Sequence, residues 1–404
     1  MLSIFGQKEH EVVAIFDIGN GSIGGAFVQF SEHGVPTILY AHREPIAYQQ
    51  HTTSKQLLKN MIKLLDSVAG NLHKTGLLHI RQRFHVHNIK RCFCVFSSPW
   101  YISHTRNMKI SEEKPFVVTR KYIDDLIRKE EDDFIKTLKE GKYEQMFGSD
   151  TRLLEKKIIH TKLNGYEVDH PLNKKAKELE ITFFSSFVAH EIIMSVEDAL
   201  LKHFHFKSVD FHSYALASWS AVRDMYPTTT DFLFIDITGE VTDIMLTQAG
   251  ILSETITFPL GRSMIIRKIV DELKVSPEVA VSFLSVFAKG SLEEKFMKKM
   301  QDLLKSSLDY WIESCLKTIN ILKESHIISR KVFITADADV AHLFYDVLTQ
   351  TLPSEMNIPN NLFEVIVLKP EVMKIVAHVE QGVERDSFLL LESEFLNKIA
   401  FGIV

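Results

Sequence analysis

Two segments with the same pattern constrain the fold of this chain more than any other feature. Each is a run of β-branched and aromatic residues that meets an aspartate and then a turn of small residues: Ile15 to Ser22, and Phe234 to Asp243. A second apolar run follows each turn, Ile23 to Phe30 in the first copy and Ile244 to Leu246 in the second. Apolar runs separated by a short turn of small residues are typical of β-hairpins. The pattern therefore predicts two hairpins, each with a carboxylate, backbone N–H groups and hydroxyls at its tip.

The repeat extends beyond the hairpins. In both copies a third strand and then a helix follow, over residues 12–69 and again over 232–274. Two such halves, related by duplication, predict two similar lobes with a cleft between them. Between the copies, residues 85–172 have the pattern of a separate small α+β unit, with a charged helix over Lys121 to Leu138 and a strong turn at Asn164-Gly165.

Composition excludes several classes of protein. The 404 residues are 45% apolar and 25% charged, which is ordinary for a globular protein of two or more domains. The net charge of −5 gives no reason to expect nucleic acid as a partner. No apolar run approaches the roughly 18–20 residues of a membrane span. The three cysteines, Cys92, Cys94 and Cys315, are expected to be buried thiols of a reducing compartment, so we expect a cytoplasmic protein.

Several motifs in a fixed order resemble the actin-like ATPase superfamily, most closely the FtsA and PilM family of bacterial cell-division and type IV pilus proteins. The segments that carry the resemblance are Asp17 to Ser22 (first phosphate loop), Asp236 to Asp243 (second phosphate loop), Ile256 to Ala280 (the stretch after it), Phe333 to Asp339 (adenosine loop) and Ile399 to Val404 (closing helix). The unit at 85–172 matches in location the subdomain that separates FtsA and PilM from actin, sugar kinases and chaperones. The resemblance implies a two-lobed α/β fold, ribonuclease H-like, with duplicated β-hairpin/helix halves and an inserted small α+β subdomain.

The same resemblance implies a division of the chain. Residues 1–84, closed by 173–228 and about 375–404, would form the first actin-like lobe. Residues 85–172 would form the inserted subdomain, and 229–374 the second lobe.

The resemblance also implies that ATP with Mg²⁺ binds between the two hairpin tips. Asp17 and Asp236 would be the catalytic acids and would hold Mg²⁺ through water, because Mg²⁺ keeps several of its waters. The other expected nucleotide contacts are Gly19, Asn20, Gly21, Ser22, Thr238, Gly239, Thr242, Gly261, Arg262, Thr335 and Ala336. Glycine turns let backbone N–H groups approach phosphate oxygens closely. The alternative for the two aspartates is that they are strand-end acids that cap a turn.

Three departures from the family pattern bear on that site. Thr238 and Glu240 replace glycines of the second loop, and two like charges about 4 Å apart repel by several kcal/mol at intermediate dielectric. Ala336-Asp337 replaces the glycine pair beneath the adenine. Gly261-Arg262 replaces the pair after the third strand, with Arg262 either a phosphate clamp or a surface residue. We therefore expect weak or absent ATP hydrolysis, and a cleft that binds nothing fits these residues as well as an active one.

The function that the resemblance implies is a scaffold at the cytoplasmic face of the membrane. A PilM-like role in pilus assembly is favoured, because the chain stops at Val404 with the closing helix, whereas FtsA carries a membrane-targeting helix beyond it. We therefore expect peripheral attachment through a partner and no direct membrane insertion. PilM-like proteins accept a peptide of a membrane protein beside the small subdomain, where Trp100, Tyr101 and Phe116 are the candidate exposed contacts, with ordinary packing as the alternative.

Three other functions remain open at this stage. The close alternative is an FtsA-like partner of the division ring. A sugar or acetate kinase would need a substrate pocket with a catalytic acid and no insertion at 85–172. A filament protein would self-assemble, which the sequence does not test. A metal site at His85 and His87 is disfavoured, because no third ligand stands near them.

Overall fold

The computed structural model describes residues 10–46, 53–139, 150–291, 293–356, 359 and 362–402, and the last two residues of the expected closing helix lie outside these ranges. The strands are β1 (His10–Ile18), β2 (Ser22–Ser31), β3 (Thr37–Pro45), β4 (Arg91–Phe96), β5 (Tyr101–Val117), β6 (Thr151–Leu163), β7 (Tyr166–Glu167), β8 (Lys175–Ala189), β9 (Ser208–Ser213), β10 (Phe232–Ile237), β11 (Thr242–Gln248), β12 (Ile251–Phe258), β13 (Lys331–Ala336), β14 (Glu364–Val367) and β15 (His378–Val379). The helices are α1 (Ser54–Asn71), η1 (Leu72–Gly76), α2 (Leu77–Phe84), α3 (Arg120–Lys139), α5 (His190–Leu201), α6 (Tyr214–Met225), α7 (Arg262–Leu273), α8 (Pro277–Ala288), α9 (Glu294–Lys323), α10 (Ala341–Glu355), η3 (Val372–Ile375) and α11 (Ser387–Ala400).

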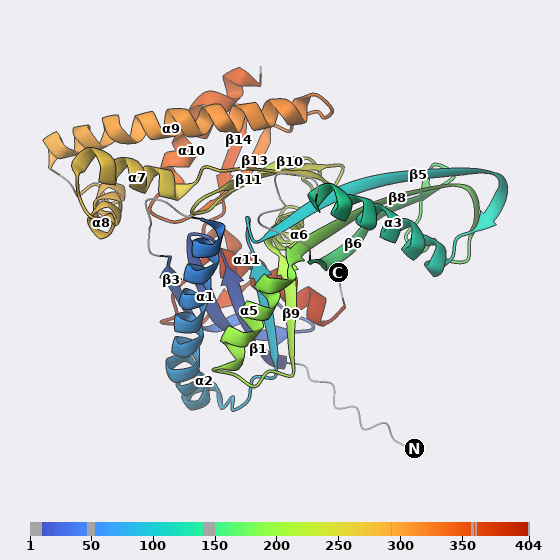
Figure 1. Cartoon of the computed structure of the whole chain (residues 1–404), viewed down its shortest axis with the longest axis horizontal. Helices are drawn as coiled ribbons and strands as arrows, with labels where there is room; N and C mark the ends of the chain where they lie inside the picture. Colours follow the sequence, from blue (N-terminus) through green and yellow to red (C-terminus); the bar gives the residue numbers. More distant parts are fainter. Residues whose placement is uncertain are drawn as a thin grey trace.

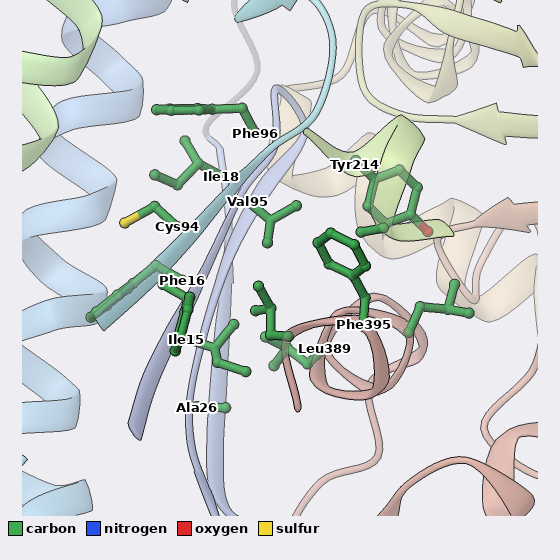
Figure 2. Close-up of a cluster of buried hydrophobic side chains, with 14 of the residues drawn as sticks. Ile15, Phe16, Ile18, Ala26, Cys94, Val95, Phe96, Tyr214, Leu389 and Phe395 are labelled. Carbon is green, nitrogen blue, oxygen red and sulfur yellow. The ribbon is translucent and has the colours of Figure 1, made fainter. Parts of the chain in front are cut away.

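The first lobe is a six-stranded sheet in the order β15-β3-β2-β1-β4-β9, covered by helices on both faces (Figure 1). Its central strands are apolar without interruption, because both of their faces are buried. Figure 2 shows the alternation: Ile18, Cys94 and Phe96 point to one face, while Val95 points to the opposite face, where Leu389 and Phe395 of α11 lie. Helix α11 thus closes this lobe, as the resemblance implies.

The second lobe repeats the hairpin of the first. Its sheet has the order β12-β11-β10-β13-β14, and β10 is antiparallel to β11 and parallel to β13, as β1 is to β2 and β4. Asp17 and Asp236 are each the second-to-last residue of the first strand of their hairpin. The two hairpins predicted from the sequence are therefore confirmed, and their aspartates occupy equivalent places.

The apolar core of the first lobe extends into the second lobe. Successive residues of β10 point to opposite faces: Leu233 and Ile235 pack in the core of the second lobe, whereas Phe232 and Phe234 pack in the cluster that fills the first lobe. Tyr214 of α6 contacts Phe234 edge to face, with ring centroids 6.4 Å apart. Helix α6 is rich in small buried residues, so it lies close to both sheets.

The inserted subdomain is a four-stranded antiparallel sheet, β5-β8-β6-β7, with α3 packed on it, and it projects from the body as an arm (Figure 1). Its bounds differ from the expected 85–172. Strand β4 pairs with β1 and β9 in the first lobe, and β8, which extends to Ala189, pairs with β5 and β6 along most of its length. By sheet membership the insertion therefore begins with β5 and ends with β8.

Replacing Phe395 by alanine tests the closing helix. Phe395 is fully buried between α11 and the sheet, so Phe395→Ala should lower the free energy of unfolding by about 3–5 kcal/mol. The matched control is Ile375→Ala, because Ile375 is 66% exposed and its truncation should cost less than about 0.5 kcal/mol. Urea unfolding followed by circular dichroism measures both variants, and equal losses would contradict this account of α11.

Candidate nucleotide cleft

Asp17 lies buried where the first hairpin turns, and an arginine from β3 pairs with it. The Nη2 atom of Arg43 donates to Oδ2 of Asp17 at 2.6 Å, and Nη1 donates to the Ser22 hydroxyl at 2.8 Å. The register of β2 and β3 places Arg43 opposite Gly24, where a Cβ atom would lie 2.6 Å from the Arg43 guanidinium. A cation of the chain itself therefore stands beside the carboxylate that was expected to hold magnesium.

Asp386 is the second acid on the same guanidinium. It accepts hydrogen bonds from Nε and Nη2 of Arg43, and as the N-cap of α11 it also accepts from the backbone N–H groups of Phe388 and Leu389. The Phe388 ring lies under the guanidinium carbon, 5.1 Å from ring centroid to carbon. Arg43 is thus fixed from three directions, and it joins the first hairpin to the closing helix.

Asn20 connects the two hairpin tips. Its Oδ1 atom accepts from the backbone N–H of Glu240 at 2.7 Å, and its Nδ2 atom donates to the Thr238 hydroxyl at 2.9 Å and to the carbonyl of Ser98. The side chain is 2% exposed, and its bonds to Thr238 and Glu240 cross from the first lobe to the second, whereas Ser98 follows β4 of the first lobe. We call the contact made by Asn20, Gly21, Thr238, Gly239 and Glu240 the tip contact.

Glycines allow the two tips to touch. A Cβ atom on Gly21 would lie 2.9 Å from Cα of Gly239, and one on Gly239 would lie 2.6 Å from Cα of Gly21. Both distances are to backbone atoms, which cannot move aside as a flexible side chain can. The cavity that remains between Asp17, Arg43, Gly239 and Asp337 is about 20 Å³. That is room for about one water molecule.

Asp236 lies on the second lobe, directly behind the tip contact. The Thr335 hydroxyl donates to its Oδ1 atom at 2.7 Å, which ties β10 to the strand before the expected adenosine loop. Burial, followed by the charge of Asp243, raises the pKa of Asp236 well above its ordinary value, and Asp17 contributes in the same direction. Asp17 and Asp236 thus lie at equivalent places near the ends of β1 and β10, and both are buried.

A further buried acid, Glu392 of α11, stands beside Asp17. Burial and then the charge of Asp17 raise the pKa of Glu392 well above its ordinary value. Nothing in the sequence pattern singled out Glu392, Arg43 or Asp386. The one available signal was Asp386-Ser387 before an apolar run, which is a helix N-cap pattern.

Arg262 was expected to be a phosphate clamp or a surface residue, and its 12% exposure excludes a surface residue. Its guanidinium is mostly buried and pairs with Asp339, Nη2 to Oδ2 at 2.5 Å, and with Asp337 at 3.5 Å. Asp337 stands where the resemblance predicts a glycine beneath the adenine, and Arg262 stands where it predicts a glycine after β12. The two substituted residues therefore form an ion pair with each other. Ala336 ends β13 beside this pair.

Two residues of the second loop have partners within their own lobe. Glu240, whose charge was expected to oppose phosphates, pairs with Arg267 of α7. The Thr242 hydroxyl, expected to contact nucleotide, donates to the carbonyl of Leu260 at 2.7 Å and accepts from Nε1 of Trp311 at 3.0 Å. Gly261 lies against the carbonyl of Thr238, where a Cβ atom would clash.

Magnesium ATP does not fit between the two tips in the arrangement observed. The N–H of Glu240 already has the Asn20 oxygen as its acceptor, Asp17 already has a cation, and the cavity of about 20 Å³ beside Asp17 does not hold a triphosphate. A larger cavity of about 350 Å³ lies beside the tip contact and is lined in part by Asn20, Gly21, Glu240 and Arg262, but neither Asp17 nor Asp236 lines it. Among the described residues, no group of three or more histidine, cysteine, aspartate or glutamate side chains is placed to hold a metal ion.

The aromatic side chains expected at a partner surface are placed differently. Trp100 is 3% exposed and donates from Nε1 to the carbonyl of Gly19 at 3.0 Å, so it supports the first loop. Tyr101 is 4% exposed, and its hydroxyl accepts from the N–H of Ala215. Phe116 is half-buried against Tyr122. The expectation that Trp100 and Tyr101 are exposed is therefore wrong, because both complete the packing at the base of β5.

A groove does lie beside the inserted subdomain, on another side. It has a volume of about 400 Å³ and is lined by Arg91, Phe93, Leu153, Leu154, Ile193, Val209, Asp210, Phe211, His212 and Ile399. Strand β9 is an edge strand of the first lobe's sheet, and most of β6 is paired on one side only, by β8. At one end Glu155 accepts from the N–H of Ser213 at 2.9 Å and contacts Nδ1 of His212 at 3.0 Å, which ties the two strands together.

Comparison with solved structures confirms the fold class. A chain of the PilM–PilN type IV pilus biogenesis complex matches with a TM-score of 0.63 at 12% identity, over 97% of this chain and 98% of that chain. The ethanolamine utilization protein EutJ from Carboxydothermus hydrogenoformans matches at 0.44, with 10% identity over 96% and 88% of the two chains. A Bacteroides thetaiotaomicron protein with an actin-like ATPase fold matches at 0.39, with 8% identity over 98% and 99%. No family model and no curated protein sequence matches the chain.

The buried acid Asp243 predicts a dependence of stability on pH. Burial raises its pKa to about 6 from 3.8, against a hydrogen bond from Thr257 that lowers it. The folded state therefore binds the proton more tightly than the unfolded state, and this contribution to stability is lost as pH rises from about 4 through 6. Asp243→Asn removes the free-energy cost of burying an ionised carboxylate. The asparagine side chain keeps an oxygen that can accept the hydrogen bond from the Thr257 hydroxyl. The free energy of unfolding of this variant, relative to that of the unsubstituted protein, should rise between pH 4 and pH 7 by up to about 3 kcal/mol.

Urea unfolding at both pH values measures the difference. Asp309→Asn is the control, because Asp309 is exposed on α9 and its replacement removes the same formal charge. Parallel pH profiles for Asp243→Asn and the unsubstituted protein would contradict the assignment.

Proposed function

We propose that this chain is a scaffold protein with a PilM-like role, which binds an extended cytoplasmic segment of a membrane protein of a pilus-assembly machine. The observation that carries the proposal is the similarity to a chain of the PilM–PilN complex, which spans almost the whole of both chains and therefore includes the inserted subdomain. The proposal assigns no reaction to the cleft, because the residues at the two hairpin tips are engaged with one another.

The groove between β6 and β9 supports the proposal. Both strands have backbone edges without a sheet partner along the groove, and an extended peptide gains affinity by pairing with such an edge. Leu154, Val209 and Phe211 provide apolar contacts for alternate side chains of that peptide. Arg91 and Asp210, which line the same groove, supply one charge of each sign to orient it.

The proposed attachment to the membrane is indirect. No helix of the described residues is both long enough and apolar enough to cross a bilayer. In this proposal the membrane partner brings its cytoplasmic segment to the groove, and the scaffold stays at the inner face through that contact alone.

Fluorescence anisotropy with a labelled synthetic peptide of the cytoplasmic segment of PilN from the same cells tests the proposal. Leu153 lines the groove and is 41% exposed, so Leu153→Glu should leave the fold intact. It should weaken peptide binding about tenfold or more, equivalent to ~1.4 kcal/mol, because it places a charge against an apolar contact.

Ile158→Glu is the matched control. Ile158 lies on the same strand and is 39% exposed, but it lines a different cavity, beside Arg120 and His170. The affinity of the Ile158→Glu variant for the peptide should equal that of the unsubstituted protein. Failure of the unsubstituted protein to bind the peptide, or equal binding by both variants, would count against the PilM-like role. Binding of a cytoplasmic segment of a division-ring protein instead would favour the FtsA-like alternative.

A further inference from the structure

We propose that the chain closes its own nucleotide cleft, with Asn20 in the position of a phosphate and Arg43 in the position of the cation, so that no nucleotide is needed to hold the lobes together. This inference does not depend on the identity of the partner in the groove. It rests on three features of the described residues: the bonds of Asn20, the ion pairs of Arg43, and the room left between them.

Asn20 satisfies the second loop as a phosphate oxygen would. In an actin-like cleft, the backbone N–H groups of the hairpin turn are the donors available to an anion. Here the N–H of Glu240 donates to Oδ1 of Asn20 at 2.7 Å. The same carboxamide donates to the Thr238 hydroxyl and to the Ser98 carbonyl, which a phosphate cannot do. The side chain therefore makes a bond to the Thr238 hydroxyl that an anion could not donate, and two of its three bonds, to Thr238 and Glu240, join the lobes directly.

Arg43 satisfies Asp17 as a metal ion would. Its guanidinium is shared between Asp17 and Asp386, and the side chains of the three residues are 18%, 3% and 10% exposed. An ion arriving at Asp17 would have to compete with a charge that is already bonded there and rests on Phe388. Displacing Arg43 would also leave Asp386 without its cation next to the N-terminus of α11. Removing one partner from a buried ion pair costs free energy, because the remaining charge stays buried without a counter-charge.

The room left between these groups is the third feature. Gly21 and Gly239 are in van der Waals contact, and the remaining cavity of about 20 Å³ takes about one water. A phosphate group can pass between Asp17 and the second loop only if the tips separate, which breaks the bonds of Asn20 to Thr238 and Glu240. The larger cavity of about 350 Å³ beside the tips has neither Asp17 nor Asp236 in its lining. The arrangement of the two lobes at the tips is therefore set by the chain's own side chains, whatever the concentration of nucleotide.

Titration with a fluorescent ATP analogue and Mg²⁺ is the first measurement. The unsubstituted protein should show no saturable binding at millimolar analogue, and Mg²⁺-ATP should not change its unfolding temperature. Saturable binding that raises the unfolding temperature and is lost in Asp17→Ala would overturn the proposal, because the cleft would then work as a nucleotide site.

Hydrogen–deuterium exchange of the full chain tests the contact itself. Asn20→Ala should speed exchange of the amides of residues 238–241 about tenfold, because the bonds that protect this turn across the lobes are lost. Arg43→Met should do the same for residues 19–22. In both variants β1 and β10 should stay protected, which shows that the fold is retained. Unchanged exchange at the tips in both variants would overturn the proposal.

A double-mutant cycle with Thr238→Val and Asn20→Ala keeps the proposal testable even if one substitution lowers the stability of the fold. Thr238→Val removes the hydroxyl that accepts from Asn20 without adding volume. A double-mutant cycle with Asn20→Ala should give an effect on the unfolding temperature smaller than the sum of the two single effects, because both substitutions remove the same bond. Strict additivity would mean that the two tips are independent, and would overturn the proposal.

Discussion

The buried carboxylate of Asp17 is the constraint on which this end of the molecule depends. An ionised acid with 2% exposure needs a partner of opposite charge, and β3 supplies it as Arg43. That requirement fixes the end of β3 and, through Asp386, the start of α11. Helix α11 in turn covers the sheet of the first lobe, with Leu389 and Phe395 on its apolar side (Figure 2). One charge pair thus sets the relation between a hairpin near the start of the chain and a helix near its end.

The two lobes are joined in two chemically different ways. Away from the tips, the aromatic face of β10 enters the apolar cluster of the first lobe, a contact that is strong but not directional. At the tips, the carboxamide of Asn20 makes directional bonds to a single loop. The first contact keeps the lobes together, and the second fixes their angle.

The sequence predicted the parts of this structure that follow from repeated local patterns. Both hairpins, the charged helix α3 and the equivalent places of Asp17 and Asp236 in their strands are found as expected, because each rests on apolar periodicity or on a turn signal. Strand β5 escaped prediction, since it is a mostly exposed edge strand in which charged and polar residues hide the alternation. The arginine at position 43 also escaped, because its partners at 17 and 386 are adjacent only in the folded chain. Trp100 read as a surface aromatic, and only the fold shows that its indole supports the Gly19 carbonyl.

The touching glycines at 21 and 239 have a consequence for evolution and for motif searches. A glycine in such a loop is usually taken as a sign that a ligand comes near, but here the neighbour is another stretch of the same backbone. Descendants of this protein could lose every affinity for nucleotide and still retain both glycines, since any larger residue at either position would wedge the halves apart. In such a lineage, a retained phosphate-loop motif would reflect the close packing of the two glycines and would not indicate that the protein is an ATPase.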